Sequence, residues 1–180
     1  MLKGDKVLLT ALDPGNAETT RGWMNDPEVT RWLLSGHVPI TAASESAFYA
    51  RMESSATDHV FEIHVAEDGR FIGLCGLHDL DPVHRHAEIG ITVGDLSAQN
   101  HGYGRDAIVT MLRFGFGTLG LHRIEVRFIE GNDRAAHLYP SMGFQPVGIL
   151  REHIFLRGAY RDEHVLDMLE SEFAGRYGHA

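Results

Sequence analysis

Alternating apolar and polar residues predict most of the strands in this chain. Residues 60–65 read Val-Phe-Glu-Ile-His-Val, and residues 123–129, Arg-Ile-Glu-Val-Arg-Phe-Ile, repeat the same two-residue period. This period is typical of a strand with one buried and one exposed face. We expect further strands at 6–11, 70–78, 86–93, 147–156 and 160–169, with a loop at 79–84 and an Arg157-Gly158 turn between the last two strands.

Helical spacing and capping residues predict the helices. Helical segments are expected at 17–24, at 28–34, from Thr41 to Ser54, at 104–120 and from Asn132 to Met142. Thr41 and Asn132 are favourable N-cap residues, and Gly143 suits the left-handed position that ends a helix. One face of segment 104–120 carries four apolar residues at helical spacing: Ile108, Met111, Leu112 and Leu119.

This order of elements predicts an α/β (α+β) fold. The segment at 104–120 is long enough to be a crossover helix, so the strands at 86–93 and 123–129 are expected to be parallel neighbours. The meander before them and the C-terminal hairpin make the rest of the sheet antiparallel. The chain shows no repeat, low-complexity tract or linker, and we expect residues 1–180 to form a single domain.

Charge and cysteine content narrow the classes of function. The formal net charge is −9, which disfavours non-specific nucleic-acid binding because that needs a basic face. The one cysteine, Cys75, excludes an internal disulfide and is expected to be a buried structural thiol. No apolar run approaches the roughly 18 residues of a membrane span, and the first residues lack an apolar signal core. We therefore expect a cytoplasmic protein that binds neither nucleic acid nor membrane.

Two glycines between a predicted strand and a predicted helix suggest an anion site. The pattern Gln99-x-x-Gly102-x-Gly104 lets the backbone approach an anion closely, and the helix start supplies unpaired N–H groups. The chain lacks the Gly-Lys-Ser/Thr of nucleotide hydrolases and the Gly-x-Gly-x-x-Gly of dinucleotide folds. A plain glycine turn that opens a helix explains the pattern equally well.

A second motif changes this balance. The segment Asn132-Asp-Arg-Ala-Ala-His-Leu-Tyr-Pro-Ser-Met-Gly-Phe144 resembles a cofactor motif of the GNAT superfamily of acetyl-CoA-dependent N-acetyltransferases, and Gln99-Asn-His-Gly-Tyr-Gly104 resembles its pyrophosphate loop. Trp23-Met-Asn-Asp-Pro-Glu-Val29 is similar to the ribosomal-protein N-terminal acetyltransferase branch. Val83-His-Arg-His-Ala-Glu88 and Gly158-Ala-Tyr-Arg-Asp162 resemble bacterial spermidine acetyltransferases. The resemblance runs from about residue 6 to 170.

The resemblance implies a fold and a cofactor, acetyl-CoA, which serves as co-substrate without a metal. The expected GNAT fold has a twisted sheet of six to seven strands with flanking helices, and its parallel strand pair splays to admit the acetyl thioester. The residues implied in cofactor binding are Ile91, Thr92, Val93, Gln99, Asn100, His101, Gly102, Tyr103, Gly104, Arg105, Asn132, Ala135 and Tyr139.

The resemblance also implies catalytic roles. Direct acetyl transfer to an amine needs a proton acceptor for the ammonium, a donor for the oxyanion and an acid for the leaving thiolate. Tyr139 matches the family's general acid, although a tyrosine on an amphipathic helix is often a core residue. Glu88 matches a glutamate that acts as base in one branch. It could instead pair with Arg85 or Arg127, leaving ordered water as the base. A backbone N–H near Val93 is the expected oxyanion donor.

The sequence does not identify the acceptor amine. A protein N-terminus and a small amine, including an antibiotic amine, fit the branch, and spermidine is the alternative. Polyamine enzymes of this type carry acidic residues in the loop that reads Leu34-Ser-Gly-His-Val-Pro39 here, so Glu28 or Glu45 would have to substitute. A regulatory acyl-CoA-binding module without catalysis is an alternative of another class, and the C-terminal hairpin could pair across a homodimer.

Histidines are numerous but carry no assigned role. His84 and His86 share one face of an extended segment and could ligate zinc, yet no cysteine or third spaced ligand supports a metal site. His37 and His64 could line an acceptor pocket, but their spacing does not assign them.

Overall fold

The structure, a computed structural model, describes residues 1–34 and 38–178. Contacts group the chain into two compact units, Met1–Leu80 with Ile89–Met111 and Asp81–Glu88 with Leu112–Ala180. The single domain expected from the sequence therefore stays a prediction. No helix in the described part of the chain is long and apolar enough to cross a membrane.

The first unit is built on antiparallel strands with two packed helices, α1 and α2. Its elements are β1 (Leu2–Lys3), β2 (Val7–Ala11), α1 (Ala17–Met24), α2 (Ala42–Ser54), β3 (His59–Val65), most of β4 (Phe71–Asp81), the end of β5 (His86–Val93) and most of α3 (Tyr103–Arg113). Three short 3-10 turns lie between them: η1 (Pro14–Asn16), η2 (Thr30–Trp32) and η3 (Leu96–Ala98). Alternating residues of the strands, such as Val7, Leu9 and Ile63, are fully buried and form the core.

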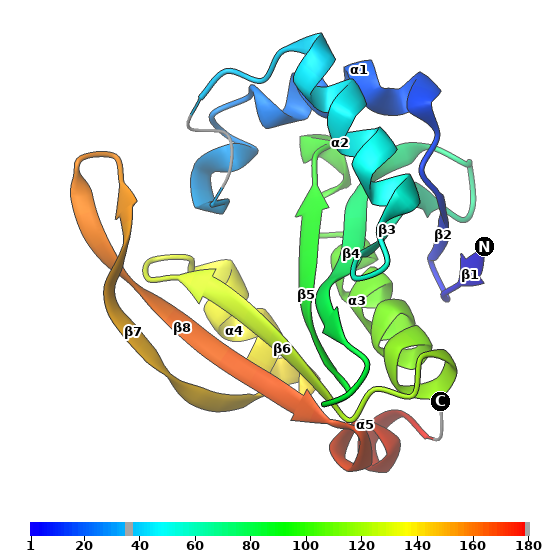
Figure 1. Cartoon of the computed structure of the whole chain (residues 1–180), viewed down its shortest axis with the longest axis vertical. Coiled ribbons are helices and arrows are strands. Elements are labelled where there is room, and N and C mark those ends of the chain that lie inside the picture. The colour runs from blue at the N-terminus through cyan, green and yellow to red at the C-terminus, as the bar shows by residue number, and fades with distance from the viewer. Residues whose placement is uncertain (35–37, 179–180) are drawn as a thin grey trace. The chain divides into compact units, whose positions relative to one another are not determined.

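The second unit contains the parallel strand pair and the C-terminal hairpin (Figure 1). Its elements are the start of β5, the π-helical turn η4 (Phe114–Thr118), β6 (Arg123–Ile129), α4 (Asp133–Met142), β7 (Gln145–Leu156), β8 (Ala159–Leu169) and α5 (Glu170–Tyr177). β5 pairs with β6 in parallel from His86–Arg123 to Glu88–Glu125. β8 pairs antiparallel with both β6 and β7.

The observed sheet confirms the predicted fold class. The strand order is β1-β2-β3-β4-β5-β6-β8-β7, a mixed sheet with one parallel pair. It has eight strands, more than the six to seven expected, because the short β1 adds to its edge. The loop predicted at 79–84 is wrong over its first three residues, which continue β4 to Asp81. There the Leu80 amide donates a hydrogen bond to the Thr57 carbonyl.

The helix predicted at 104–120 is shorter than its pattern indicated. The α-helical part ends at Arg113 and the next five residues form the π turn η4. Ile108, Met111 and Leu112 are fully buried, as predicted, but Leu119 follows the turn and is only half-buried. A π turn has more residues per turn than an α-helix, so the apolar phase is lost. The segment at 28–34 yields only η2, and α5 was not predicted.

β4 and β5 approach each other most closely where a glycine faces a backbone carbonyl. A Cβ atom added at Gly73 would lie 2.0 Å from the Thr92 carbonyl oxygen and 3.0 Å from the Val93 Cα atom. Because both obstacles are backbone atoms, a side chain at this position would push the strands apart. This contact sets the position of the segment from Thr92 onwards.

We expect Gly73→Ala to lower the free energy of unfolding by about 3 kcal/mol because the new methyl group overlaps backbone. The matched control is Gly22→Ala in α1, where nothing lies within 4 Å of the added Cβ. That change should raise stability by up to about 1 kcal/mol, the helix propensity difference between the two residues. Urea denaturation of both variants measures the difference. Equal effects in the two would contradict the close approach.

Candidate active site

The segment between β5 and α3 forms a tightly held loop in the first unit. Asp95 caps the turn η3 by accepting a hydrogen bond from the Ser97 amide at 2.9 Å. Arg70 Nη1 donates to the other oxygen of Asp95 at 2.7 Å. The Ser97 hydroxyl bond is the main reason why the pKa of Asp95 lies below its usual range. The loop therefore starts from a fixed, ionised anchor.

The loop then turns into α3 at the predicted glycines. Gly102 has a φ of 84°, a left-handed conformation that favours glycine, and α3 begins at the next residue, Tyr103. A Cβ atom at Gly104 would lie 3.6 Å from Val93 and 3.7 Å from Ile91, so the start of α3 packs on β5. Gln99 Nε2 donates a hydrogen bond to the Val93 carbonyl oxygen at 3.4 Å. The first N–H groups of α3 have no acceptors within the helix. This geometry suits an anion such as pyrophosphate.

The first unit contains most of the residues that were predicted to bind the cofactor. These residues are Ile91, Thr92, Val93, Gln99, Asn100, His101, Gly102, Tyr103, Gly104 and Arg105. They occupy the end of β5, the loop and the first turn of α3. Their contacts with a cofactor stay predictions.

Lys6 is a neighbour of this loop that the sequence did not reveal. Its ammonium donates a hydrogen bond to the His101 carbonyl oxygen at 3.0 Å and lies 3.2 Å from the position of a Cβ atom on Gly102. The backbone amides of Lys6 and Val7 donate to the Asp106 carboxylate at 2.7 and 3.0 Å. Asp106, in the first turn of α3, thus fixes a cation beside the predicted anion site. No motif around Lys6 signals this, because the contact spans about a hundred residues of chain.

Trp23, part of the N-terminal motif, lies against the same loop. A Cβ atom on Gly94 would lie 2.1 Å from the Trp23 indole, so the ring rests directly on the backbone after β5. The indole also packs on Phe71, with ring centroids 4.8 Å apart. Helix α1 is thereby joined to the start of the loop, which gives the motif a structural role.

The remaining predicted residues lie in the second unit. Asn132 caps α4 by accepting a hydrogen bond from the Ala135 amide at 3.2 Å, which confirms the predicted cap. Tyr139 is buried, with its ring centroid 6.2 Å from that of Phe128 and 5.7 Å from that of Phe144. The Tyr139 ring is therefore part of the core, which agrees with the interpretation of Tyr139 as a core residue on an amphipathic helix. Its role as general acid stays a prediction.

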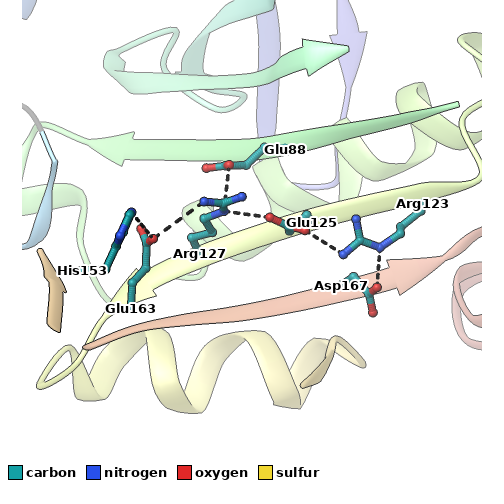
Figure 2. A network of polar contacts seen from close by, with 7 residues as sticks. All are labelled: Glu88, Arg123, Glu125, Arg127, His153, Glu163 and Asp167. Carbon is teal, nitrogen blue, oxygen red and sulfur yellow. Dashed lines mark hydrogen bonds and ion pairs between the residues drawn. The ribbon is translucent and has the colours of Figure 1, made fainter. Parts of the chain in front are cut away.

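Glu88 is one end of a charge network on β5, β6, β7 and β8 (Figure 2). Its carboxylate lies 3.2 Å from Arg127 Nε and its side chain is 33% exposed. Of the two arginines expected as partners of Glu88, Arg127 is the one observed. Arg85 instead donates a hydrogen bond to the Gly120 carbonyl oxygen at 2.6 Å.

Arg127 is shared by three carboxylates. It donates to Glu125 at 2.7 Å and lies 3.8 Å from Glu163, whose side chain is only 2% exposed. Burial would raise the pKa of Glu125, but hydrogen bonds from Arg123 and Arg127 outweigh it and hold that pKa below its usual value. The same guanidinium is the observed ion-pair partner of Glu88, so the candidate base lies against a cation.

The outer parts of the network extend along the hairpin. Arg123 bridges Glu125 and Asp167, and His153 Nε2 lies 3.6 Å from Glu163. Within the described residues, Glu163 Oε2 has no hydrogen-bond partner, although it lies near Arg127 and His153. The network is a charged face of the second unit that contains the candidate base.

Other side chains named by the sequence are placed as follows. His37 and the rest of 35–37 lie outside the described residues. Both ring nitrogens of His64 are hydrogen-bonded: Nε2 to the Glu62 carboxylate at 2.9 Å and Nδ1 to the Gly69 carbonyl oxygen at 3.1 Å. His64 therefore has no free nitrogen for the acceptor amine. His84 and His86 stack with centroids 6.4 Å apart, and no metal-binding group of residues occurs in the described chain. Burial raises the pKa of the Cys75 thiol, as expected for a structural cysteine.

The two carboxylates considered for a polyamine differ in exposure. Glu28 is exposed, whereas Glu45 on α2 is only 4% exposed. Burial raises the pKa of Glu45, opposed only by the charge of Arg21. Among the described residues, Glu45 Oε1 has no hydrogen-bond partner. Glu45 is therefore a costly buried group, and Glu28 is the more accessible carboxylate.

This burial predicts a pH-dependent gain from Glu45→Gln. The pKa of Glu45 in the folded protein lies above its unfolded value, which is about 4.3 for glutamate. The protonated carboxyl therefore favours the folded state below about pH 4.3, and this contribution to stability is lost as the pH rises through the folded pKa. The variant should therefore be more stable than the native protein by about 1 kcal/mol at pH 8, with less gain at pH 4. Urea denaturation at both pH values measures this. Glu53→Gln, exposed on the same helix, is the control, and a loss at pH 8 confined to Glu45→Gln would contradict the assignment.

Comparison with known proteins agrees with this arrangement. The profile of the acetyltransferase (GNAT) domain matches residues 6–145. An uncharacterised N-acetyltransferase, p20 of Bacillus licheniformis, is 28% identical over 178 residues, covering 95% of this chain and 97% of that protein. A putative ribosomal N-acetyltransferase, YdaF of Bacillus subtilis, is 24% identical over 175 residues, 95% of each chain.

A solved structure with a similar fold holds the cofactor product. The spermidine N-acetyltransferase of Vibrio cholerae, in complex with CoA and spermine, superimposes with a TM-score of 0.86 at 26% identity. The match covers 93% of this chain and 98% of that one. The family profile matches most of the chain, which carries the glycine-bearing loop after β5 and the capped α4 with its tyrosine. The chain therefore belongs to the acetyltransferase (GNAT) family.

Proposed function

We propose that this protein transfers the acetyl group of acetyl-CoA to a primary amine by direct attack within a ternary complex. The observation that carries this is the loop at the start of α3, where Gly102 in a left-handed conformation and the cation of Lys6 flank the first N–H groups of the helix. Such a loop fits the pyrophosphate of CoA. Asn132, Ala135 and the backbone of Ile91, Thr92 and Val93 would hold the pantetheine arm.

Two side chains of the second unit would act on protons. Tyr139 would protonate the departing CoA thiolate, and Glu88 would take a proton from the acceptor or orient a water that does so. The pairing of Glu88 with Arg127 supports an ionised carboxylate that attracts a cationic amine. A backbone N–H near Val93 would stabilise the oxyanion.

The acceptor we favour is the amino terminus of a protein or a small primary amine. The match to YdaF over nearly the whole chain supports the peptide, and the match to the spermidine enzyme supports the polyamine. In the segment 34–39 the sequence has no carboxylate, and Glu45 is buried, so only Glu28 offers an exposed acid in this set. A non-catalytic acyl-CoA-binding module would not need Tyr139 in the cofactor motif.

The test is thiol release from acetyl-CoA across polyamines, aminoglycosides and Ala- or Ser-starting peptides. We expect release with one class, which would identify the acceptor type. Acetyl-CoA binding measured by calorimetry without release for any class would support the non-catalytic module. The absence of binding would refute the proposal.

A homodimer and a cytoplasmic location also stay predictions. Several large apolar side chains of the hairpin are exposed: Val147, Ile149, Phe155 and Tyr160. Three of them, Val147, Ile149 and Phe155, lie on the edge strand β7 and are compatible with pairing to a second copy.

Gly102→Val should abolish measurable acetyl-CoA binding. The left-handed φ of 84° disfavours a β-branched residue, and the new side chain would point at the Lys6 ammonium. Calorimetry measures the affinity, and the thermal midpoint shows whether the fold survives. An unchanged dissociation constant in a folded variant would show that the loop does not hold the cofactor.

Tyr139→Phe should lower kcat by about 10²- to 10⁴-fold, the usual contribution of a general acid. The ring contacts with Phe128 and Phe144 remain in the variant, so its stability and acetyl-CoA affinity should change little. Phe128→Leu is the matched control, because it disturbs the same cluster without removing a hydroxyl. Turnover of Tyr139→Phe near that of the native protein would exclude the role.

A further inference from the structure

A histidine and an aspartate of the first unit form a hydrogen-bonded pair that has no role in the mechanism proposed above. His78, on β4, has its Nδ1 atom 2.9 Å from Asp58 Oδ1. Asp58 lies just before β3 and is itself held in place, because Ser55 Oγ donates to its other oxygen at 2.7 Å. The Asp58 amide donates back to Ser55 Oγ at 3.0 Å. The carboxylate is thus aimed at the imidazole by its own turn.

The charge state of Asp58 determines the tautomer of His78. Burial would raise the pKa of Asp58, but hydrogen bonds from Ser55 and His78 outweigh it and leave that pKa below its usual value. An ionised carboxylate only accepts hydrogen bonds, so the Nδ1 atom of His78 carries the proton. In the neutral ring, Nε2 then has the free lone pair. The pair has the geometry of an oriented proton acceptor.

The Nε2 atom lies over bare backbone. A Cβ atom on Gly76 would lie 3.2 Å from it, and one on Gly90 of β5 would lie 3.4 Å from it. Within the described residues, atoms of the His78 ring are the non-adjacent atoms that lie within 4 Å of the Gly90 position. The His78 side chain is 36% exposed, and no described residue forms a hydrogen bond with Nε2. A substrate group could therefore reach this nitrogen.

The strand beneath His78 is the one expected to hold the cofactor. Gly90 and Thr92 share one face of β5, whereas Ile91 and Val93 face the start of α3 at Gly104. Two residues along a strand span about 7 Å. His78 is thus about that distance along β5 from Thr92, at the segment to which the proposed function assigns the pantetheine arm.

Other groups around the ring do not compete for its proton. Asp58 is the charged side chain in contact with it. The Val60 Cγ2 atom and the His59 carbonyl oxygen lie near the same Gly76 position as Nε2, at 2.9 and 3.1 Å from an added Cβ atom. The base proposed so far, Glu88, has its carboxylate occupied by Arg127.

We propose that His78 is the general base of the acetyl transfer and that Asp58 is the residue that positions it; this rests on the proposed function. Nε2 takes a proton from the acceptor ammonium and later gives it to solvent. The freed nitrogen lone pair forms a bond to the thioester carbon, and the C–S bond breaks as the oxyanion collapses. The attacking nitrogen then loses a second proton, and the departing thiolate gains one, so that CoA leaves as the thiol.

The test compares His78→Gln, Asp58→Asn and His64→Gln in acetyl-CoA turnover with the best amine of the panel. His78→Gln should lower kcat by about 10²- to 10³-fold at neutral pH and leave acetyl-CoA affinity within about twofold. Its deficit should shrink as the pH rises, because the amine then loses its proton without help. Asp58→Asn should lose about 10-fold, since the imidazole loses its orientation but keeps its lone pair.

His64→Gln is the matched control for a purely structural loss. His64 is also paired with a carboxylate, Glu62, but neither of its nitrogens is free. We expect its thermal midpoint to fall while kcat stays within about threefold of the native value. Calorimetry with acetyl-CoA shows that each variant is folded.

Two outcomes are decisive against the proposal. If the native protein releases thiol and folded His78→Gln does so within about threefold at every pH, His78 is not the base and the proposed function survives. If the native protein releases no thiol with any amine, the proposed function fails and the role of His78 fails with it.

Discussion

The two-residue period of β5 is the constraint on which the site depends. Ile91 and Val93 face Gly104 and hold the start of α3, whereas Gly90 on the other face lies under His78. The strand cannot slide by one residue without exchanging these faces. The close approach of Gly73 to Thr92 and the bonds from the Gly94 and Asp95 amides to the Ile72 carbonyl fix its register. One short strand thus presents an anion loop on one side and an imidazole on the other.

Charge is arranged differently in the two units. In the second, the guanidinium of Arg127 is shared by three carboxylates. In the first, Asp58 has one histidine, and that histidine keeps a free nitrogen. An imidazole that is held by a carboxylate through one nitrogen keeps its other nitrogen for a substrate proton, which is the arrangement that the role proposed for His78 requires.

Local signals in the sequence were enough for the scaffold. Alternation predicted β3, β5 and β6, capping residues predicted α2 and α4, and the glycines predicted the loop that opens α3. The predictions failed where geometry departs from a regular period, as in the π turn after Arg113 and the irregular end of β4 at Asp79, with its φ of 50°. Contacts between distant segments were equally hidden. Lys6 reaches the loop from the turn between β1 and β2, and nothing near Asp58 in the sequence points to His78, twenty residues on.

The basicity of the acceptor decides how much a base is worth. A peptide α-amino group, with a pKa near 8, is about one-quarter unprotonated at pH 7.5, whereas an alkylamine with a pKa near 10.4 is unprotonated in about one molecule per thousand. An oriented imidazole therefore matters far more for a polyamine than for a protein N-terminus. For a peptide acceptor the deficit of His78→Gln should lie near the lower end of the range of about 10²- to 10³-fold, because more of the amine is already unprotonated. A strong dependence on His78 would consequently favour an alkylamine acceptor, although the segment at 34–39 lacks the carboxylates that polyamine enzymes carry there.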